Sequence, residues 1–461
     1  MSQRSHRRGL SALLGLVVLV ALVAAGPLPG LGGAPGARPA AALGGPPPPA
    51  WRFDGGGYGH GIGMSQYGAY GMGLRGARAG AILGFYYRGT RVRRAVLPSA
   101  VRVGVLQAWR DPSTGRRLGR VLVRGRPVPG ARSSKGAFTA VGVDRRGRRK
   151  ARRLPGGVTY AVRSQAGGTS MFRGSRRVFG PTRAGSGVSL RYQAGVRVPA
   201  LLVLPQAGRT LRWGRLDIGL VREGAAIRPR AVAIMSFNAY LRGLAEVPSS
   251  WPAETLKAQA IAARSYALAT VRAAGQHRGR WSWDGCNCGV YADTRDQHWV
   301  GWAKERGRGG ARWVAAVRAT DRLVITWRSR VVQAFYSSSS GGYTASTTSW
   351  GGPSLPYFPA RRDPDDRARG RNPNHRWRAT RSAAAVSAAL RRYGVGRVVA
   401  LRVRSADASG RVRAVEVRGT RRTVVVPGGT FRSLLRLRST KFAIRRPLCQ
   451  PSVRQIELLN H

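Results

Sequence analysis

The chain has 461 residues, which is enough for more than one hydrophobic core, so we expect one large domain with an added lobe or two domains. It carries 80 Lys and Arg against 18 Asp and Glu, and this formal net charge of +62 must be neutralised by a polyanion or by salt. Only three cysteines are present, which excludes a disulfide-rich scaffold. The charge leaves two explanations open, an anionic partner or Arg at solvated positions.

The first 50 residues have the pattern of a targeting segment and a linker. Arg4, Arg7 and Arg8 precede an apolar run over 10–25, and a Pro-rich and Gly-rich stretch follows. The run fits a cleaved signal peptide or a membrane anchor near the lower length limit for a span, and both remain open. We therefore expect a secreted or membrane-anchored protein of the extracytoplasmic cell envelope, with the membrane only as an N-terminal tether. Export argues against nucleic acid and for anionic wall polymers or anionic lipid surfaces as partners.

The elements expected after the linker are those of an α+β protein. Residues 51–90 form a separate Gly-rich segment, and Val-rich runs punctuated by Gly, Pro and Arg predict a β-rich lobe over 91–230. A mixed domain over 231–445 follows, with a long Ala-rich helix that lines a groove, and 446–461 is a tail. We expect helices also at 312–319 and 382–393, and paired strands at 323–327 and 331–336.

The long helix has a clear start and stop in the sequence. We expect Ser249 or Ser250 as its N-cap, Pro252 and Glu254 in its first turn, and its end at Gly275. Pro252 fixes φ in the first turn, and the negative charge of Glu254 interacts favourably with the helix dipole. Glu254 is not expected to act in catalysis.

One carboxylate stands out just before this helix. Glu246 is one of six glutamates in the chain, and Lys257 and Arg264 share a helical stripe with Ile261 and Leu268. Cations on an apolar stripe are not ordinary solvated charges, so we expect them to face a groove beside Glu246 and to bind substrate oxygens. A salt bridge that only stabilises the helix is the competing interpretation.

Two further segments carry polar groups suited to a sugar. Residues 336–344 read Tyr-Ser-Ser-Ser-Ser-Gly-Gly-Tyr-Thr, and hydroxyls on a tight Gly turn could bind a sugar or an acetamido group; a flexible polar loop is the alternative. Residues 55–69 alternate Gly with polar positions, with His60 and Gln66 as polar tips. These glycines do not match the dinucleotide fingerprint, and no Gly-x-Ser-x-Gly nucleophile elbow is present.

The run from Tyr240 to Ala267 closely resembles the core of the SpoIID/LytB family, the stage II sporulation protein D domain. The Ser-Ser-Gly-Gly-x-Thr loop, the Gly-His-Gly-x-Gly-Met-Ser-Gln segment and the ending over 430–442 are similar to that family too. The resemblance implies a peptidoglycan lytic transglycosylase that cuts between N-acetylmuramic acid and N-acetylglucosamine and leaves a 1,6-anhydro end. It implies Glu246 as the catalytic residue. The implied substrate-binding residues are Lys257, Arg264, Ser339, Ser340, Gly342 and Thr344, with His60 and Gln66.

The chemistry of such a reaction needs only one carboxyl group. Ordinary glycosidases use two carboxylates, but one Glu can protonate the leaving oxygen and then deprotonate O6 of the muramic acid. Burial should keep this Glu protonated at the start. The family also includes enhancers of wall amidases, so a glycan-binding activator without turnover is the alternative. A basic nucleic-acid-binding protein is a third interpretation, but it leaves the export segment unexplained.

Three features differ from the family pattern. The Gly-His-Gly-x-Gly-Met-Ser-Gln segment comes first here rather than last, and a circularly shifted order would still let it close the same groove. Cys286 and Cys288, with His277 and His298 nearby, could bind a structural zinc ion, form a short-range disulfide or stay as free thiols. No other cofactor is expected, and the acidic stretch 363–366 is predicted to be a turn rather than a calcium site. The 91–230 lobe has no family signature.

Overall fold

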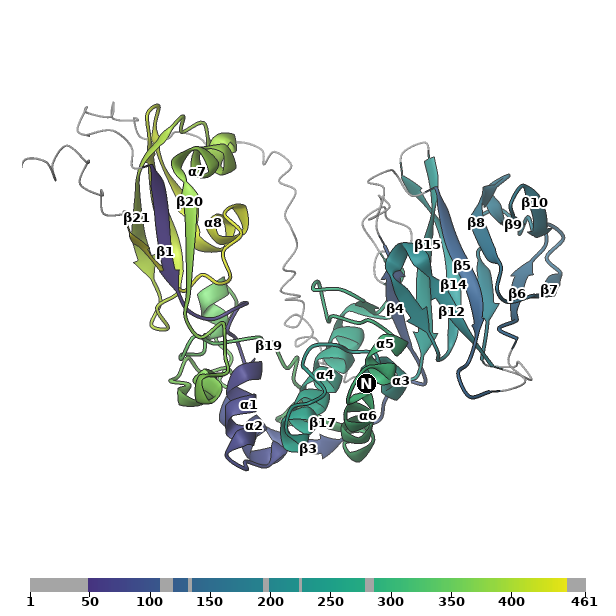
Figure 1. The fold of residues 1–461 in the computed structure, drawn as a ribbon, viewed down its shortest axis with the longest axis horizontal. Coiled ribbons are helices and arrows are strands. Elements are labelled where there is room, and N and C mark those ends of the chain that lie inside the picture. The colour runs from purple at the N-terminus through teal and green to yellow at the C-terminus, as the bar shows by residue number, and fades with distance from the viewer. Residues whose placement is uncertain are drawn as a thin grey trace, which may run out of the picture. The chain divides into compact units, whose positions relative to one another are not determined.

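The computed structural model describes residues 49–107, 119–131, 135–193, 199–223, 226–277 and 286–445. These residues form two compact units, one made of 92–333 and the other of 49–91 with 334–445. Both contain helices and several sheets, which confirms the predicted α+β class (Figure 1). Within these described ranges no helix is both long and apolar enough to cross a bilayer. The apolar run over 10–25, the tail over 446–461 and Cys449 lie outside the described residues.

Two large sheets dominate the unit of residues 92–333. In spatial order the first contains β16 (Val290–Tyr291), β4 (Val101–Leu106), β15 (Ala226–Met235), β14 (Arg215–Glu223), β11 (Val188–Arg191), β6 (Phe138–Val143) and β7 (Arg149–Leu154). The second contains β10 (Arg176–Phe179), β9 (Gly168–Arg173), β8 (Thr159–Gln165), β5 (Arg120–Pro127), β12 (Ala200–Leu204) and β13 (Arg209–Leu211). Strand β15 contacts β5 and β8 of the second sheet, so the Val-rich runs build a core between the sheets.

Four helices of the same unit come after β15 in the sequence: α3 (Phe237–Arg242), α4 (Ala253–Ala274), α5 (Trp302–Arg306) and α6 (Gly310–Ala319). The Ala-rich face of α4 packs closely on α6 and on β17 (Leu323–Trp327). Helix α4 ends at Gly275 as predicted, but its N-cap is Pro252, which makes no side-chain cap bond, instead of Ser249 or Ser250. Strand β17 pairs with β18 (Arg330–Val331) and with β3 (Arg91–Arg94).

The unit of 49–91 with 334–445 contains two three-stranded sheets. One has β1 (Ala50–Gly55) between β20 (Trp377–Ser382) and β24 (Phe442–Arg445), and the other contains β21 (Val398–Ala406), β22 (Val412–Gly419) and β23 (Thr423–Pro427). Their apolar faces share one core with α7 (Ala383–Leu390) and α8 (Gly428–Leu434) (Figure 1). Aromatic side chains fill its centre, including Phe53, Phe431 and Phe442 in edge-on or stacked contact.

The Gly-rich segment packs against the Ser-Gly loop in this unit, although they are far apart in the sequence. Strand β2 (Met64–Ser65) runs parallel to β19 (Tyr336–Ser337). The predicted pairing of 331–336 with 323–327 is therefore correct only at its start, where Val331 lies in β18 and the Val332 N–H donates to the Ile325 carbonyl at 2.9 Å. The close approach requires glycine: a Cβ at Gly63 (φ +67°) would lie 2.1 Å from the Phe335 carbonyl oxygen. Helices α1 (Gln66–Leu74) and α2 (Ala79–Tyr86) continue from β2.

Candidate functional site

The chain between α3 and α4 holds the carboxylate of Glu246 in a fixed position. Glu246 is half-buried, and its Oε1 accepts a hydrogen bond from the backbone N–H of His298 at 2.6 Å. The Ala245 N–H donates to the His298 carbonyl at 2.9 Å, and Leu244 forms a bridge with Trp299. One backbone N–H therefore orients the carboxyl group, and the pairing of residues 244–245 with 298–299 fixes the chain that carries it. His298 contributes its backbone here, and its side chain is exposed.

A second charged side chain, which the sequence analysis missed, lies close to Glu246. Lys304 of α5 is half-buried, and its Nζ donates to the carbonyl of Val247, the residue after Glu246, at 2.5 Å. Burial lowers the pKa of Lys304 to about 8, and the negative charge of Glu246 acts in the opposite direction. The ammonium group also lies 5.4 Å from the centre of the Trp313 ring. Lys304 is thus a confined cation within electrostatic reach of Glu246.

The two cations of the predicted helix stripe have other partners. Lys257 is half-exposed and pairs with Glu254 one turn earlier on α4, at 2.7 Å. Arg264 has no exposed surface and donates to the carbonyls of Leu323 at 3.0 Å and Val317 at 3.2 Å. Burial lowers the pKa of Arg264 to about 10. This placement makes Arg264 a link from α4 to α6 and β17, and it does not favour the predicted direct contact with substrate.

The two cysteines in the segment after α4 are joined by a disulfide. Cys286 and Cys288 form a disulfide and pack, fully buried, against Val232 and Ile234 of β15. Of the three states left open by the sequence, the structure has the disulfide, and sulfur atoms in a disulfide are not thiolate ligands for zinc. The Nδ1 of His277 bonds to the Asn287 side chain at 2.6 Å. Within the part of the chain that the structure describes, no cluster of three His, Cys, Asp or Glu side chains could hold a metal ion.

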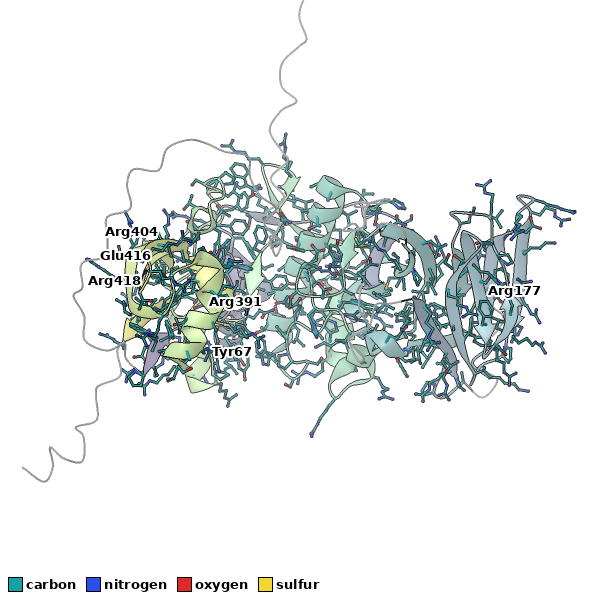
Figure 2. All side chains as sticks on the ribbon, turned by 90° about the horizontal axis from the view of Figure 1, so that it is seen from above. Tyr67, Arg177, Arg391, Arg404, Glu416 and Arg418 are labelled. Carbon is teal, nitrogen blue, oxygen red and sulfur yellow. A yellow bond between two sulfur atoms is a disulfide. The ribbon has the colours of Figure 1, made fainter. Side chains whose placement is uncertain are left out.

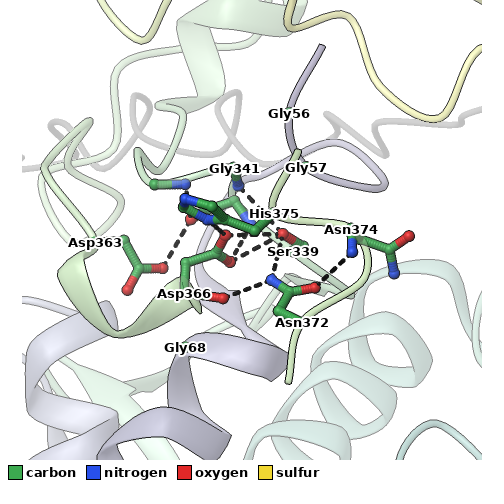
Figure 3. A network of polar contacts seen from close by, with 12 residues as sticks. Gly56, Gly57, Gly68, Ser339, Gly341, Asp363, Asp366, Asn372, Asn374 and His375 are labelled. Carbon is green, nitrogen blue, oxygen red and sulfur yellow. Dashed lines mark hydrogen bonds and ion pairs between the residues drawn. The ribbon is translucent and has the colours of Figure 1, made fainter. Parts of the chain in front are cut away.

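In the other unit, the hydroxyls of the Ser-Gly loop converge on a buried aspartate. Asp366 accepts a hydrogen bond from Ser339 Oγ at 2.9 Å (Figure 3). It also accepts hydrogen bonds from Ser65 Oγ at 2.8 Å and from the Ser340 backbone N–H at 2.9 Å. His375 Nδ1 bonds to the second carboxylate oxygen at 2.8 Å. These donors hold the pKa of Asp366 below its usual value although the group is buried.

A second buried aspartate stands beside the first. Asp363 accepts hydrogen bonds from Tyr86 Oη at 3.0 Å and Ser340 Oγ at 2.8 Å. Burial, and then the negative charge of Asp366, raise the pKa of Asp363 to about 7. The 363–366 segment, predicted to be a turn, is instead the start of the 3₁₀ helix η3 (Pro364–Gly370), with Asp363 at the N-cap. Its two buried carboxyls organise the Ser-Gly loop from inside.

The other residues of the predicted loop site are also used within the protein. Thr344 is buried, and its hydroxyl donates to the Pro359 carbonyl at 2.8 Å. Ser339 and Ser340 have no exposed surface. These three hydroxyls stabilise the loop rather than face a ligand, which differs from the predicted sugar contacts. Gly342 is partly exposed at φ +87°, where its position faces the His375 ring.

The two polar tips predicted in the Gly-rich segment have internal roles as well. His60 Nδ1 accepts the Ile62 backbone N–H at 3.0 Å. Burial and the nearby charges of Arg411 and Arg432 lower the pKa of His60 to about 4, so the imidazole is neutral near pH 7. Gln66 is buried at the first position of α1.

Positive charge is spread over the surfaces of both units. Arg177 of β10, Arg391 and Arg404 are exposed and project from the ribbon into solvent (Figure 2). The structure thus has basic surface for an anionic partner, although exposed Arg side chains also fit the simpler explanation of solvated positions.

Comparison with known proteins gives a family for part of the chain. Residues 228–327 match the family model described as Stage II sporulation protein (SpoIID). A segment of 127 residues is 30% identical to the amidase enhancer of Bacillus subtilis (strain 168), covering 26% of this chain and 14% of that protein. Another match, 26% identical over 126 residues, covers 27% of this chain and 31% of an uncharacterised protein of Brachyspira hyodysenteriae (strain ATCC 49526 / WA1). The matches span less than a third of the length of either relative.

The family match includes Glu246, Lys304 and the disulfide, but not the Ser-Gly loop or the Gly-rich segment. It agrees with the resemblance found in the sequence from Tyr240 to Ala267. Residues 228–327 of this chain therefore match a SpoIID domain.

Proposed function

We propose that this is an exported cell-wall protein whose SpoIID domain acts as a peptidoglycan lytic transglycosylase. The observation that supports it most is the Glu246 carboxylate, half-buried and oriented by the His298 N–H within the matched residues. The N-terminal Arg cluster and the apolar run over 10–25 support export to the cell envelope, and the net charge of +62 supports retention on anionic wall polymers.

In the proposed reaction, Glu246 acts twice. As an acid it protonates the glycosidic oxygen between N-acetylmuramic acid and N-acetylglucosamine, and the bond from C1 of the muramic acid to that oxygen breaks. The resulting carboxylate then accepts the proton of the O6 hydroxyl, and O6 bonds to C1. The products are a free 4-hydroxyl on N-acetylglucosamine and a 1,6-anhydro muramic end. Glu246 regains its proton and no water is consumed, so one carboxyl group suffices.

Lys304 fits a supporting role in this cycle. Its ammonium group stabilises the Glu246 carboxylate that exists between the two proton transfers, because opposite charges attract strongly in a partly desolvated site. Its bond to the Val247 carbonyl also fixes the chain next to Glu246. Lys304 does not favour the protonated acid with which the cycle starts. Loss of solvent would favour that form when glycan covers the half-buried carboxyl, because desolvation disfavours the charged carboxylate.

A second function is favoured by one observation. One relative is named an amidase enhancer, and the match to it covers 26% of this chain. In that function the protein would bind peptidoglycan and increase the activity of a wall amidase without cleaving glycan. Loss of the Glu246 carboxyl would then have little effect.

The decisive test is digestion of purified peptidoglycan, intact and stripped of stem peptides, followed by mass spectrometry for anhydro-muramic ends. We expect Glu246→Gln to lower their release by about 10³-fold, within the range for a lost general acid. Glu416→Gln, which changes a half-buried glutamate on β22, is the matched control and should keep full activity. If the wild-type protein gives no anhydro ends but accelerates stem-peptide release by an added amidase, the transglycosylase proposal is wrong and the enhancer function replaces it.

A further inference from the structure

A pocket of about 630 Å³ opens at one end of the β20-β1-β24 sheet. Strand β1 is antiparallel to both neighbours, so its last residues meet the first residues of β20 and β24. The volume falls in the range of small-ligand sites. The lining residues, all from the unit of 49–91 and 334–445, are Asp54, Gly55, Gly56, Arg376, Trp377, Arg378, Gly410, Lys441, Phe442 and Ala443.

The charges in this pocket do not balance. Its single carboxylate, Asp54, is already bonded to Arg378 at 2.9 Å and to Arg52 at 3.1 Å. Two lining cations, Arg376 and Lys441, form no ion pair with any residue that the structure describes. The pocket therefore has excess positive charge, which an anionic group would neutralise.

Lys441 is the cation best placed to hold such a group. Its Nζ donates to the Gly341 carbonyl at 3.0 Å, which fixes the side chain and leaves two N–H bonds for a ligand. Burial, and then the charges of Arg411 and Arg376, lower the pKa of Lys441 to about 8. The negative charges of Asp366 and Asp407 act in the opposite direction, but neither carboxylate forms an ion pair with Lys441 among the described residues, so a bound anion would stabilise this partly desolvated ammonium group.

The walls of the pocket are rigid because the backbone is packed tightly around it. A Cβ at Gly55 would lie 2.2 Å from the Trp377 ring, and a Cβ at Gly56 would lie 2.8 Å from the His375 carbonyl oxygen. The Trp377 Nε1 donates to the Gly57 carbonyl at 2.8 Å and holds this wall in place. A ligand therefore meets a preformed cavity and a fixed ammonium group, which lowers the entropic cost of binding.

We propose that this pocket binds one carboxylate or phosphate group of an anionic ligand, with Lys441 as the central donor and Arg376 as the second cation. Lysine acts as a compact point charge, so the geometry selects charge and size rather than a planar bidentate partner. If the proposed cell-wall role holds, the group is either the carboxylate of muramic acid and its peptide or the phosphate of an anionic wall polymer. The pocket does not involve Glu246, so binding and glycan cleavage can be tested separately.

The test is calorimetric titration of the protein with N-acetylmuramic acid, glycerol phosphate and the uncharged N-acetylglucosamine. We expect at least one of the two anions to bind at least tenfold more tightly than the neutral sugar. Tighter binding of N-acetylmuramic acid would indicate a muramic carboxylate as the natural ligand, and tighter binding of glycerol phosphate would indicate a wall-polymer phosphate. Lys441→Met should weaken that binding at least tenfold and Arg376→Gln a few-fold, while Glu246→Gln should leave it unchanged. Retention of binding in Glu246→Gln separates this site from the proposed reaction.

General attraction to a protein with a net charge of +62 is the effect to exclude. Lys135→Met is the matched control, because Lys135 is exposed and its loss removes the same unit of charge. A specific site predicts no change for Lys135→Met. The proposal would be overturned if Lys441→Met and Lys135→Met weakened anion binding equally, or if Lys441→Met did not weaken it at all. If Lys441→Met does not fold, the exposed Arg376→Gln decides, and unchanged anion binding in that variant would refute the two-cation site.

Discussion

The two buried aspartates that bond to the Ser-Gly loop, Asp363 and Asp366, should differ in their response to the same Asp→Asn substitution. Asp366 carries a negative charge that four donors stabilise, from Ser65, Ser339, Ser340 and His375. Asp366→Asn removes the charge and one acceptor oxygen, so about two charge-assisted hydrogen bonds are lost. At roughly 1.5 kcal/mol each, the free energy of unfolding should fall by about 3 kcal/mol.

Asp363→Asn is the matched variant, and it should be tolerated. Because the pKa of Asp363 is raised to about 7, its carboxyl is already partly protonated at pH 7, and a neutral amide of the same shape replaces it. The expected change at pH 7 is within about 1 kcal/mol. Because the pKa of Asp363 is higher in the folded protein than in the unfolded chain, the free energy of unfolding falls as the pH rises from 3.8 through about 7. The Asn variant should therefore be more stable than the wild type at pH 8.5, by at most about 4 kcal/mol.

The assay is urea unfolding at pH 5, 7 and 8.5, read by hydrogen exchange of peptides from residues 334–375. A local readout is needed because the chain has two compact units that can unfold separately. Equal destabilisation by both Asn variants at pH 7, or an Asp363→Asn variant that gains no stability at pH 8.5, would refute the assignment of an ionised Asp366 and a partly protonated Asp363.

Three further predictions concern the SpoIID domain. The wild-type protein should release anhydro ends more slowly as the pH rises through about 8, because Lys304 loses its proton there. The Lys304→Met variant should not show this decrease, and below about pH 8 it should be about tenfold slower than the wild type. Arg264→Met leaves buried carbonyls without donors, so it should lower the free energy of unfolding by about 2–4 kcal/mol in urea; a stable but inactive variant would restore the predicted substrate contact. A chelator should change neither activity nor melting temperature, since Cys286 and Cys288 are in a disulfide; a loss reversed by added zinc would contradict this.

The local elements of the fold were predictable from the sequence. One of the Val-rich runs expected within 91–230, Val101–Leu106, is strand β4. The long helix ends at Gly275, where a positive φ favours glycine. These features depend on periodicity and on single residues. The pairing of β19 with β2 was missed because its partner lies more than 270 residues earlier, and no local pattern reports such a contact.

The candidate site was only partly predictable for the same reason. Glu246 was found because glutamate is rare in this chain, but the burial of Ser339 and Ser340 depends on two aspartates that lie 23 to 27 residues further on. A signal for them existed: three of the twelve aspartates fall within the four residues 363–366. In a chain so poor in acids, such a cluster indicates charges that the fold uses internally rather than a solvated turn.

The few lysines in the sequence are the most useful signal of confined positive charges in this protein. Only five of the 80 basic residues are Lys, so Arg is the default cation of this protein. Two of the five, Lys304 and Lys441, lie in confined places where each donates to a backbone carbonyl and where burial lowers the pKa to about 8. A guanidinium is wider, spreads its charge over a plane and cannot shift its protonation into this range, so Arg would not substitute there. These two lysines therefore indicate where this protein needs a compact and titratable charge, beside Glu246 and in the anion pocket.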